Sequence, residues 1–150
     1  MLWLPCLVGV IMFAADRISK LYVSANMRLG QSIPVIENIF HITFNTNDGA
    51  AFSILSGKVP FLIIATVLII VALAVFIIVK KPKSKIFGIA VSLILAGALG
   101  NLTDRIFLGS VIDFLDAKCI HFPIFNIADC CVVIGAVLFC IYVFKSTDFD

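Results

Sequence analysis

The chain has 150 residues, of which 62% are hydrophobic and 13% are charged, and its mean hydropathy is +1.18. Soluble domains contain about 45–50% apolar and about 25% charged residues, so the composition excludes an ordinary soluble domain and predicts a membrane protein made of one domain, residues 1–150. The net charge of +2 is too small to indicate a nucleic-acid partner. The five cysteines have no CxxC spacing and predict neither a disulfide framework nor a zinc site. We expect no metal and no cofactor.

Four segments are long and apolar enough to cross a bilayer, which takes about 20 residues. They are residues 2–23, 59–79, 86–108 and 122–144. The first has neither a positively charged start nor a small-residue cleavage site, so we expect a retained span rather than a removed signal peptide. The predicted fold is an all-α membrane protein with four transmembrane helices.

The loops predict the orientation. The link at 80–85 carries four lysines, and the positive-inside rule places such a segment in the cytoplasm. With four spans, both termini are then cytoplasmic, and the loops at 24–58 and 109–121 face outward.

The longer outer loop has structure of its own. Phe40, Ile42 and Phe44 alternate with polar residues, a pattern typical of a half-buried strand. A turn signal at 47–49 and a short apolar stretch at 50–55 follow. We therefore expect a small extracytoplasmic β-sheet and a short helix at the membrane interface.

The third span carries a row of small residues that lets neighbouring helices approach closely. The row consists of Gly88, Ser92, Ala96 and Gly100, with Gly97 beside it. We expect this helix to pack against partners, with Asn101 and Arg105 at its outer end.

Polar residues of three spans are expected at one depth. Asp16, Asn101 and Asp129 each lie seven residues from the expected outer end of their span, which is about 10 Å at 1.5 Å per residue. Asp113 lies in the shorter outer loop and reaches that level only if the loop folds inward. Carboxylates near hydrocarbon are costly and indicate a functional site, and two adjacent ones can share a proton and activate a water.

Structural explanations remain open for several charged residues. Asp16 and Lys20, at i and i+4, either neutralise each other or take part in a substrate site, and Arg105 either supports the site or extends to the interface. Asp104 either caps locally or pairs with Arg105. The remaining acids, Asp48 and Asp116, are expected in solvated loops.

Five blocks of the sequence resemble the lipoprotein signal peptidases (signal peptidase II), a family of bacterial intramembrane aspartic proteases. In chain order they are Asp16-x-x-x-Lys20, Asn47-x-Gly49-Ala50-Ala51-Phe52, Gly97 to Arg105 with Asn101 and Asp104, Val111-Ile112-Asp113-Phe114, and Phe125-Asn126-Ile127-Ala128-Asp129. Asp48, inside the second block, is an acid that the family pattern does not require.

The resemblance implies roles for these residues. Asp113 and Asp129 would be the catalytic pair, and the supporting or substrate-binding residues would be Asp16, Lys20, Asn47, Gly49, Gly97, Asn101, Arg105 and Asn126. The implied reaction removes the signal peptide from prolipoproteins by cutting just before a cysteine that carries diacylglycerol. The implied location is the bacterial cytoplasmic (inner) membrane, with lipid around the enzyme and the active site toward the outer face. A monomer is the simplest expectation.

Two other functions would also place charged residues in membrane spans. A small proton-coupled transporter or channel subunit would place them near the midplane, often with repeated or broken helices. Here they gather toward one face and no repeat is present. A non-catalytic membrane scaffold explains the small residues but leaves Asp113 and Asp129 without a role.

Overall fold

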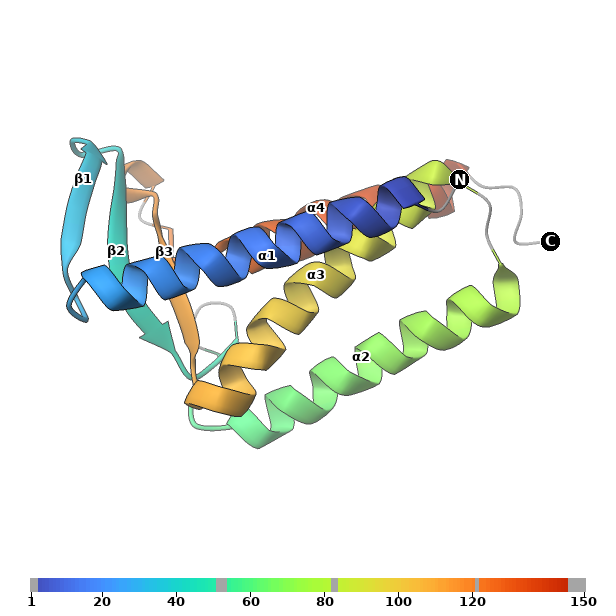
Figure 1. Cartoon of the computed structure of the whole chain (residues 1–150), viewed down its shortest axis with the longest axis horizontal. Coiled ribbons are helices and arrows are strands. Elements are labelled where there is room, and N and C mark those ends of the chain that lie inside the picture. Colours follow the sequence, from blue (N-terminus) through green and yellow to red (C-terminus); the bar gives the residue numbers. More distant parts are fainter. Residues whose placement is uncertain (1–2, 51–53, 82–83, 121, 146–150) are drawn as a thin grey trace.

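Helix α3, Lys85–Leu108, lies at the centre of the structure, because it contacts the three other long helices, α1 (Trp3–Asn26), α2 (Val59–Lys80) and α4 (Ile127–Lys145). The computed structural model describes residues 3–50, 54–81, 84–120 and 122–145. A small sheet covers one end of the helices, and α1 begins and α4 ends at the opposite end (Figure 1).

The small residues of α3 permit this packing, as predicted. A Cβ atom at Gly88 would lie 2.9 Å from a ring carbon of Pro5 on α1, and one at Gly97 would lie 2.2 Å from the backbone oxygen of Ala128 on α4. At Gly100 the added atom would lie 2.6 Å from the Asp16 carboxylate. Helices α1 and α4 therefore approach the backbone of α3 more closely than any larger side chain would allow.

Helix α2 stands apart from the bundle and diverges from α3 toward one end (Figure 1). Leu62 is its one buried residue, although the helix consists almost wholly of apolar side chains. In the described part of the chain, α2, α3 and α4 are long and apolar enough to cross a membrane. Helix α1 has the length, but carries three charged residues in its second half, Asp16, Arg17 and Lys20.

The sheet has the strand order β1-β2-β3, from β1 (Ser32–Ile36), β2 (Phe40–Asn47) and β3 (Val111–Asp116), and all pairs are antiparallel. The strand expected around Phe40 to Phe44 is confirmed. Residues 109–121, expected as the shorter outer loop, contain β3 and the short 3₁₀ helix η2 (Lys118–Ile120), which the sequence analysis did not anticipate. The β3 sequence shows no polar–apolar alternation because nearly every residue of the strand is buried.

The expected start of the fourth helix, about residue 122, is wrong, because α4 begins at Ile127. Pro123 disfavours helical backbone before it, and Phe125 pairs with Leu115 of β3 instead. Asp129 therefore lies in the first turn of α4, not seven residues inside it. Asp16 lies ten residues before the end of α1, so both counts differ from the expected seven, although hydrogen bonds still bring the polar residues of α1, α3 and α4 together. The helix expected at 50–55 includes residues 51–53, which lie outside the described residues.

Candidate active site

Asp113 and Asp129 come from different elements and are joined by Asn126. Asp113 lies in the middle of β3 and is 2% exposed. The side-chain nitrogen of Asn126 donates to an Asp113 oxygen at 2.7 Å, and its backbone N–H donates to the Asp129 carboxylate at 3.2 Å. The Asp129 N–H returns a bond to the Asn126 side-chain oxygen at 2.8 Å. This is a capping box at the start of α4. The observed start of α4, later in the chain than predicted, is therefore itself part of the site.

Asn101 fixes the other side of Asp129. Its side-chain nitrogen donates to Asp129 at 2.8 Å, while its oxygen accepts from Lys20 at 2.9 Å and from Asn126 at 3.2 Å. Because lysine and the amide NH₂ group can only donate, the orientation of the Asn101 amide is determined. Its NH₂ group must face Asp129.

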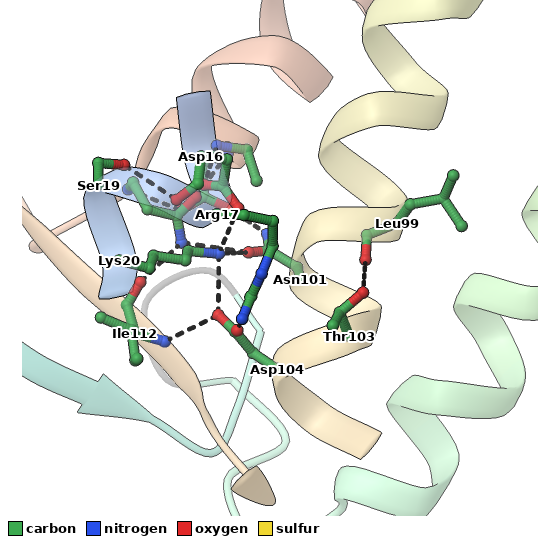
Figure 2. Close-up of polar contacts among 12 residues, drawn as sticks. Asp16, Arg17, Ser19, Lys20, Leu99, Asn101, Thr103, Asp104 and Ile112 are labelled. Carbon is green, nitrogen blue, oxygen red and sulfur yellow. Dashed lines mark hydrogen bonds and ion pairs between the residues drawn. The ribbon is translucent and has the colours of Figure 1, made fainter. Parts of the chain in front are cut away.

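Four charged side chains lie close to Asn101, namely Asp16, Arg17, Lys20 and Asp104 (Figure 2). Lys20 is 3.0 Å from Asp16 and 2.9 Å from Asp104, and Asp104 also pairs with Arg17. Lys20 and the two acids are almost wholly buried, but two positive and two negative charges balance. The second Asp16 oxygen accepts from the Ala128 N–H at 2.9 Å, which ties α1 to the first turn of α4.

The structure confirms the predicted Asp16–Lys20 pair, but a pair between Asp104 and Arg105 is wrong. These neighbours in sequence project in different directions, and Asp104 meets α1 instead. Arg17 was not among the site residues predicted from the sequence. Its position next to Asp16, inside an otherwise apolar helix, was the available signal.

Arg105 is directed to the outer loop rather than to solvent alone. Its guanidinium donates to the Gly49 carbonyl at 2.8 Å, and the Asn47 side chain accepts from the Gly49 N–H at 2.9 Å. Arg105 therefore anchors the loop that follows β2 beside Asp113.

A cavity of about 780 Å³ opens on these residues. Its polar part includes Asn47, Asn101, Arg105, Asp113 and Asp129. Its apolar part extends along the helices through Ile69, Ile94, Val132, Val133 and Ile134. The cavity thus combines a polar, acidic end with a long apolar wall.

Burial raises the pKa of Asp113 to about 7, and the negative charge of nearby Asp129 is the second largest cause of this shift. The carboxyl of Asp113 therefore exchanges its proton close to neutral pH. Such a group suits proton transfer in hydrolysis.

Among the other acids, Asp48 is exposed, as predicted, and accepts hydrogen bonds from Ser56 and the Gly57 N–H. The expectation of a solvated Asp116 is wrong: it is 3% exposed and accepts from Thr43 at 2.7 Å and from Lys118 at 2.8 Å. The bond from Thr43 joins β3 to β2 and the bond from Lys118 joins β3 to η2, both away from the cavity. Within the described ranges, no three His, Cys, Asp or Glu side chains are placed to hold a metal ion.

Comparison with known proteins identifies the family of the chain. The family model for signal peptidase (SPase) II matches residues 8–145. Lipoprotein signal peptidases of Staphylococcus aureus strains JH9 and Newman are each 41% identical over 143 residues, covering 94% of this chain and 88% of theirs.

Two solved structures of bacterial membrane enzymes, determined by the in meso method at 2.3 and 1.9 Å resolution, are each 40% identical to this chain. They superpose with TM-scores of 0.89 and 0.86, cover 95% of this chain, and are themselves covered over 88% and 94% of their length. The chain belongs to the signal peptidase II family of peptidases.

Proposed function

We propose that this protein removes the signal peptide from diacylglyceryl-modified prolipoproteins, cutting just before the lipidated cysteine, and that Asp113 and Asp129 are its catalytic pair. The observation that carries the assignment is the position of Asn126, which hydrogen-bonds both carboxylates at the end of a single cavity. The family membership of the chain supplies the class of substrate. No feature of the described structure favours a transporter.

The surroundings of the two acids support different protonation states. Asp129 accepts from Asn101 and from the Asn126 N–H, and it lies in the first turn of a helix, where the helix dipole favours negative charge. Asp113 lies on a buried strand, and its pKa is raised to about 7. We therefore assign the shared proton to Asp113.

The proposed reaction needs one water. Asp129 takes a proton from the water while the water oxygen attacks the scissile carbonyl carbon, and Asp113 donates its proton to the carbonyl oxygen. Collapse of the tetrahedral intermediate breaks the C–N bond: Asp129 passes the proton it took from water to the leaving nitrogen, and Asp113 regains a proton from a hydroxyl of the intermediate. The products are the signal peptide with a free carboxylate and the lipoprotein with a free cysteine amine.

The apolar wall of the cavity suits this substrate. It extends from the acids along α2, α3 and α4, so a signal helix and acyl chains can remain in an apolar environment while the scissile bond reaches Asp113 and Asp129. In this proposal all four helices span the cytoplasmic membrane, and the charges of α1 are buried against α3 and α4. Both termini and the lysine-rich link face the cytoplasm, the sheet lies at the outer face, and a monomer suffices.

Incubation of the purified protein in detergent with a lipidated prolipoprotein and its unlipidated form tests this function. We expect a gel shift with the lipidated form alone, and mass spectrometry of the product should find diacylglyceryl-cysteine at its N-terminus. Cleavage at another bond, or solute transport by proteoliposomes without any cleavage, would refute the proposal.

A further inference from the structure

Asp104 is a buried acid that takes no part in the proposed reaction. It lies on α3, three residues after Asn101, and is wholly buried. One carboxylate oxygen pairs with Arg17. The other accepts both from Lys20 at 2.9 Å and from the backbone N–H of Ile112 at 3.2 Å. Asp104 therefore connects α1 and α3 to strand β3 (Figure 2).

The bond to Ile112 is placed immediately before Asp113. The Ile112 carbonyl, on the other side of the same residue, accepts from the Asn126 side chain at 3.3 Å. The N–H and C=O of Ile112 are thus each held by a buried side chain, one from α3 and one from the start of α4. Together these bonds limit rotation and translation of the backbone that carries Asp113.

Strand pairing holds this backbone from the side of β2 only, where Thr46 is the partner of Ile112, because β3 is the edge strand of the described sheet. The register between β2 and β3 shifts between Ile42 and Asn45, and Asn45 is the partner of Asp113. Such an irregularity disrupts the hydrogen-bond ladder locally. Next to it, the bonds from Asp104 and Asn126 provide constraints that the ladder lacks.

We infer that Asp104 is a positioning residue, whose carboxylate holds the Ile112 N–H and thereby sets Asp113 opposite Asp129. The inference rests on the proposed function of that pair. Arg17 and Lys20 neutralise the charge of Asp104, and the bond to Ile112 requires only an acceptor oxygen at this place. An uncharged acceptor of the same shape should therefore preserve the position of Asp113, provided that the charge balance is restored.

A matched set of variants separates the acceptor from the charge. In an Arg17→Met background, Asp104→Asn and Asp104→Leu both restore the balance that Arg17→Met disturbs, and they have similar volume. Only asparagine offers an oxygen to Ile112 and Lys20. We expect kcat of the Asn variant to stay within about threefold of the Arg17→Met parent, and kcat of the Leu variant to fall about 100-fold with KM nearly unchanged, because a displacement of about 1 Å costs that much.

Hydrogen exchange of the β3 segment, measured by mass spectrometry, is the second readout and does not depend on activity. The Leu variant should exchange faster than the Asn variant at Ile112. Asp104→Ala in the same background removes the acceptor without added bulk, and it takes the place of the Leu variant if that protein does not fold. Asp116→Asn, which changes a buried acid on the same strand away from the cavity, should leave kcat unchanged.

Equal kcat values for the Asn and Leu variants, or a loss confined to KM, would overturn the inference, as would equal exchange at Ile112. If the wild-type protein itself cleaves no lipidated precursor, the proposed function fails instead. The exchange comparison then still decides whether Asp104 holds strand β3.

Discussion

Gly97→Ala tests whether the close approach of α3 and α4 sets the position of Asp129. The added Cβ would lie 2.2 Å from the backbone oxygen of Ala128 and 2.8 Å from a methyl carbon of Val132. Ordinary contact begins at 3.4 Å. Because the nearer atom belongs to the backbone, a side-chain rotation cannot relieve the overlap, and α4 must move by about 1 Å.

That movement would displace Asp129 directly, because Ala128 is the preceding residue in α4. The bond from Asn101 to Asp129, 2.8 Å long, would be stretched or broken. A misplacement of about 1 Å can cost about 100-fold in rate, and overpacking typically costs about 1–3 kcal/mol of stability. We expect kcat for a lipidated precursor to fall by about 100-fold, with a modest decrease in melting temperature.

Gly88→Ala on the same helix provides the control. Its added Cβ would lie 2.9 Å from a ring carbon of Pro5, in the half of α3 away from the acids. This variant should lose stability to a similar or smaller extent and keep its kcat. A Gly97→Ala protein that cleaves at the wild-type rate, or a Gly88→Ala protein that is equally slow, would refute the reasoning.

Three further predictions concern the residues around the pair. Asn126→Ala removes the helix cap and the hydrogen bonds that join Asp113 to Asp129. Thermal unfolding should show a loss of about 1 kcal/mol in the free energy of unfolding, and the cleavage assay should show a loss of activity. Wild-type activity would contradict this role of Asn126. The pKa of Asp113 is about 7 in the folded state, above about 3.9 in an unfolded chain, so its contribution to stability is lost as pH rises from about 4 to 7. The melting temperature of Asp113→Asn minus that of wild type should therefore be higher at pH 8 than at pH 4. Equal differences at both pH values would contradict the raised pKa. Asp116→Asn should lower the melting temperature by weakening its bonds to Thr43 and Lys118 without changing kcat, and a lower kcat in a stable protein would show that the sheet bond affects catalysis.

Elements with a strong local signal were predictable. The long apolar run of α2, the small-residue row of α3 and the alternation in β2 are each properties of a continuous segment. The Asp16–Lys20 pair was predictable for the same reason, because i and i+4 share a helix face.

Features that depend on distant partners were not predictable. Strand β3 is buried on both faces, so its sequence carries no alternation, and its pairing with β2 spans more than sixty residues. For Asp104 the sequence suggested only local roles, a cap or a pair with Arg105, because its partner Arg17 is 87 positions away. The start of α4 was misplaced because Phe125, immediately before Asn126, pairs with β3 instead of joining a helical turn.

The central claim is that Asp113 and Asp129 together carry out the hydrolysis. The most direct test compares wild type, Asp113→Asn and Asp129→Asn on one lipidated precursor, with binding of that precursor measured alongside cleavage. We predict that both variants insert into the membrane and bind the precursor but release no signal peptide. Cleavage at the wild-type rate by either variant would contradict the claim.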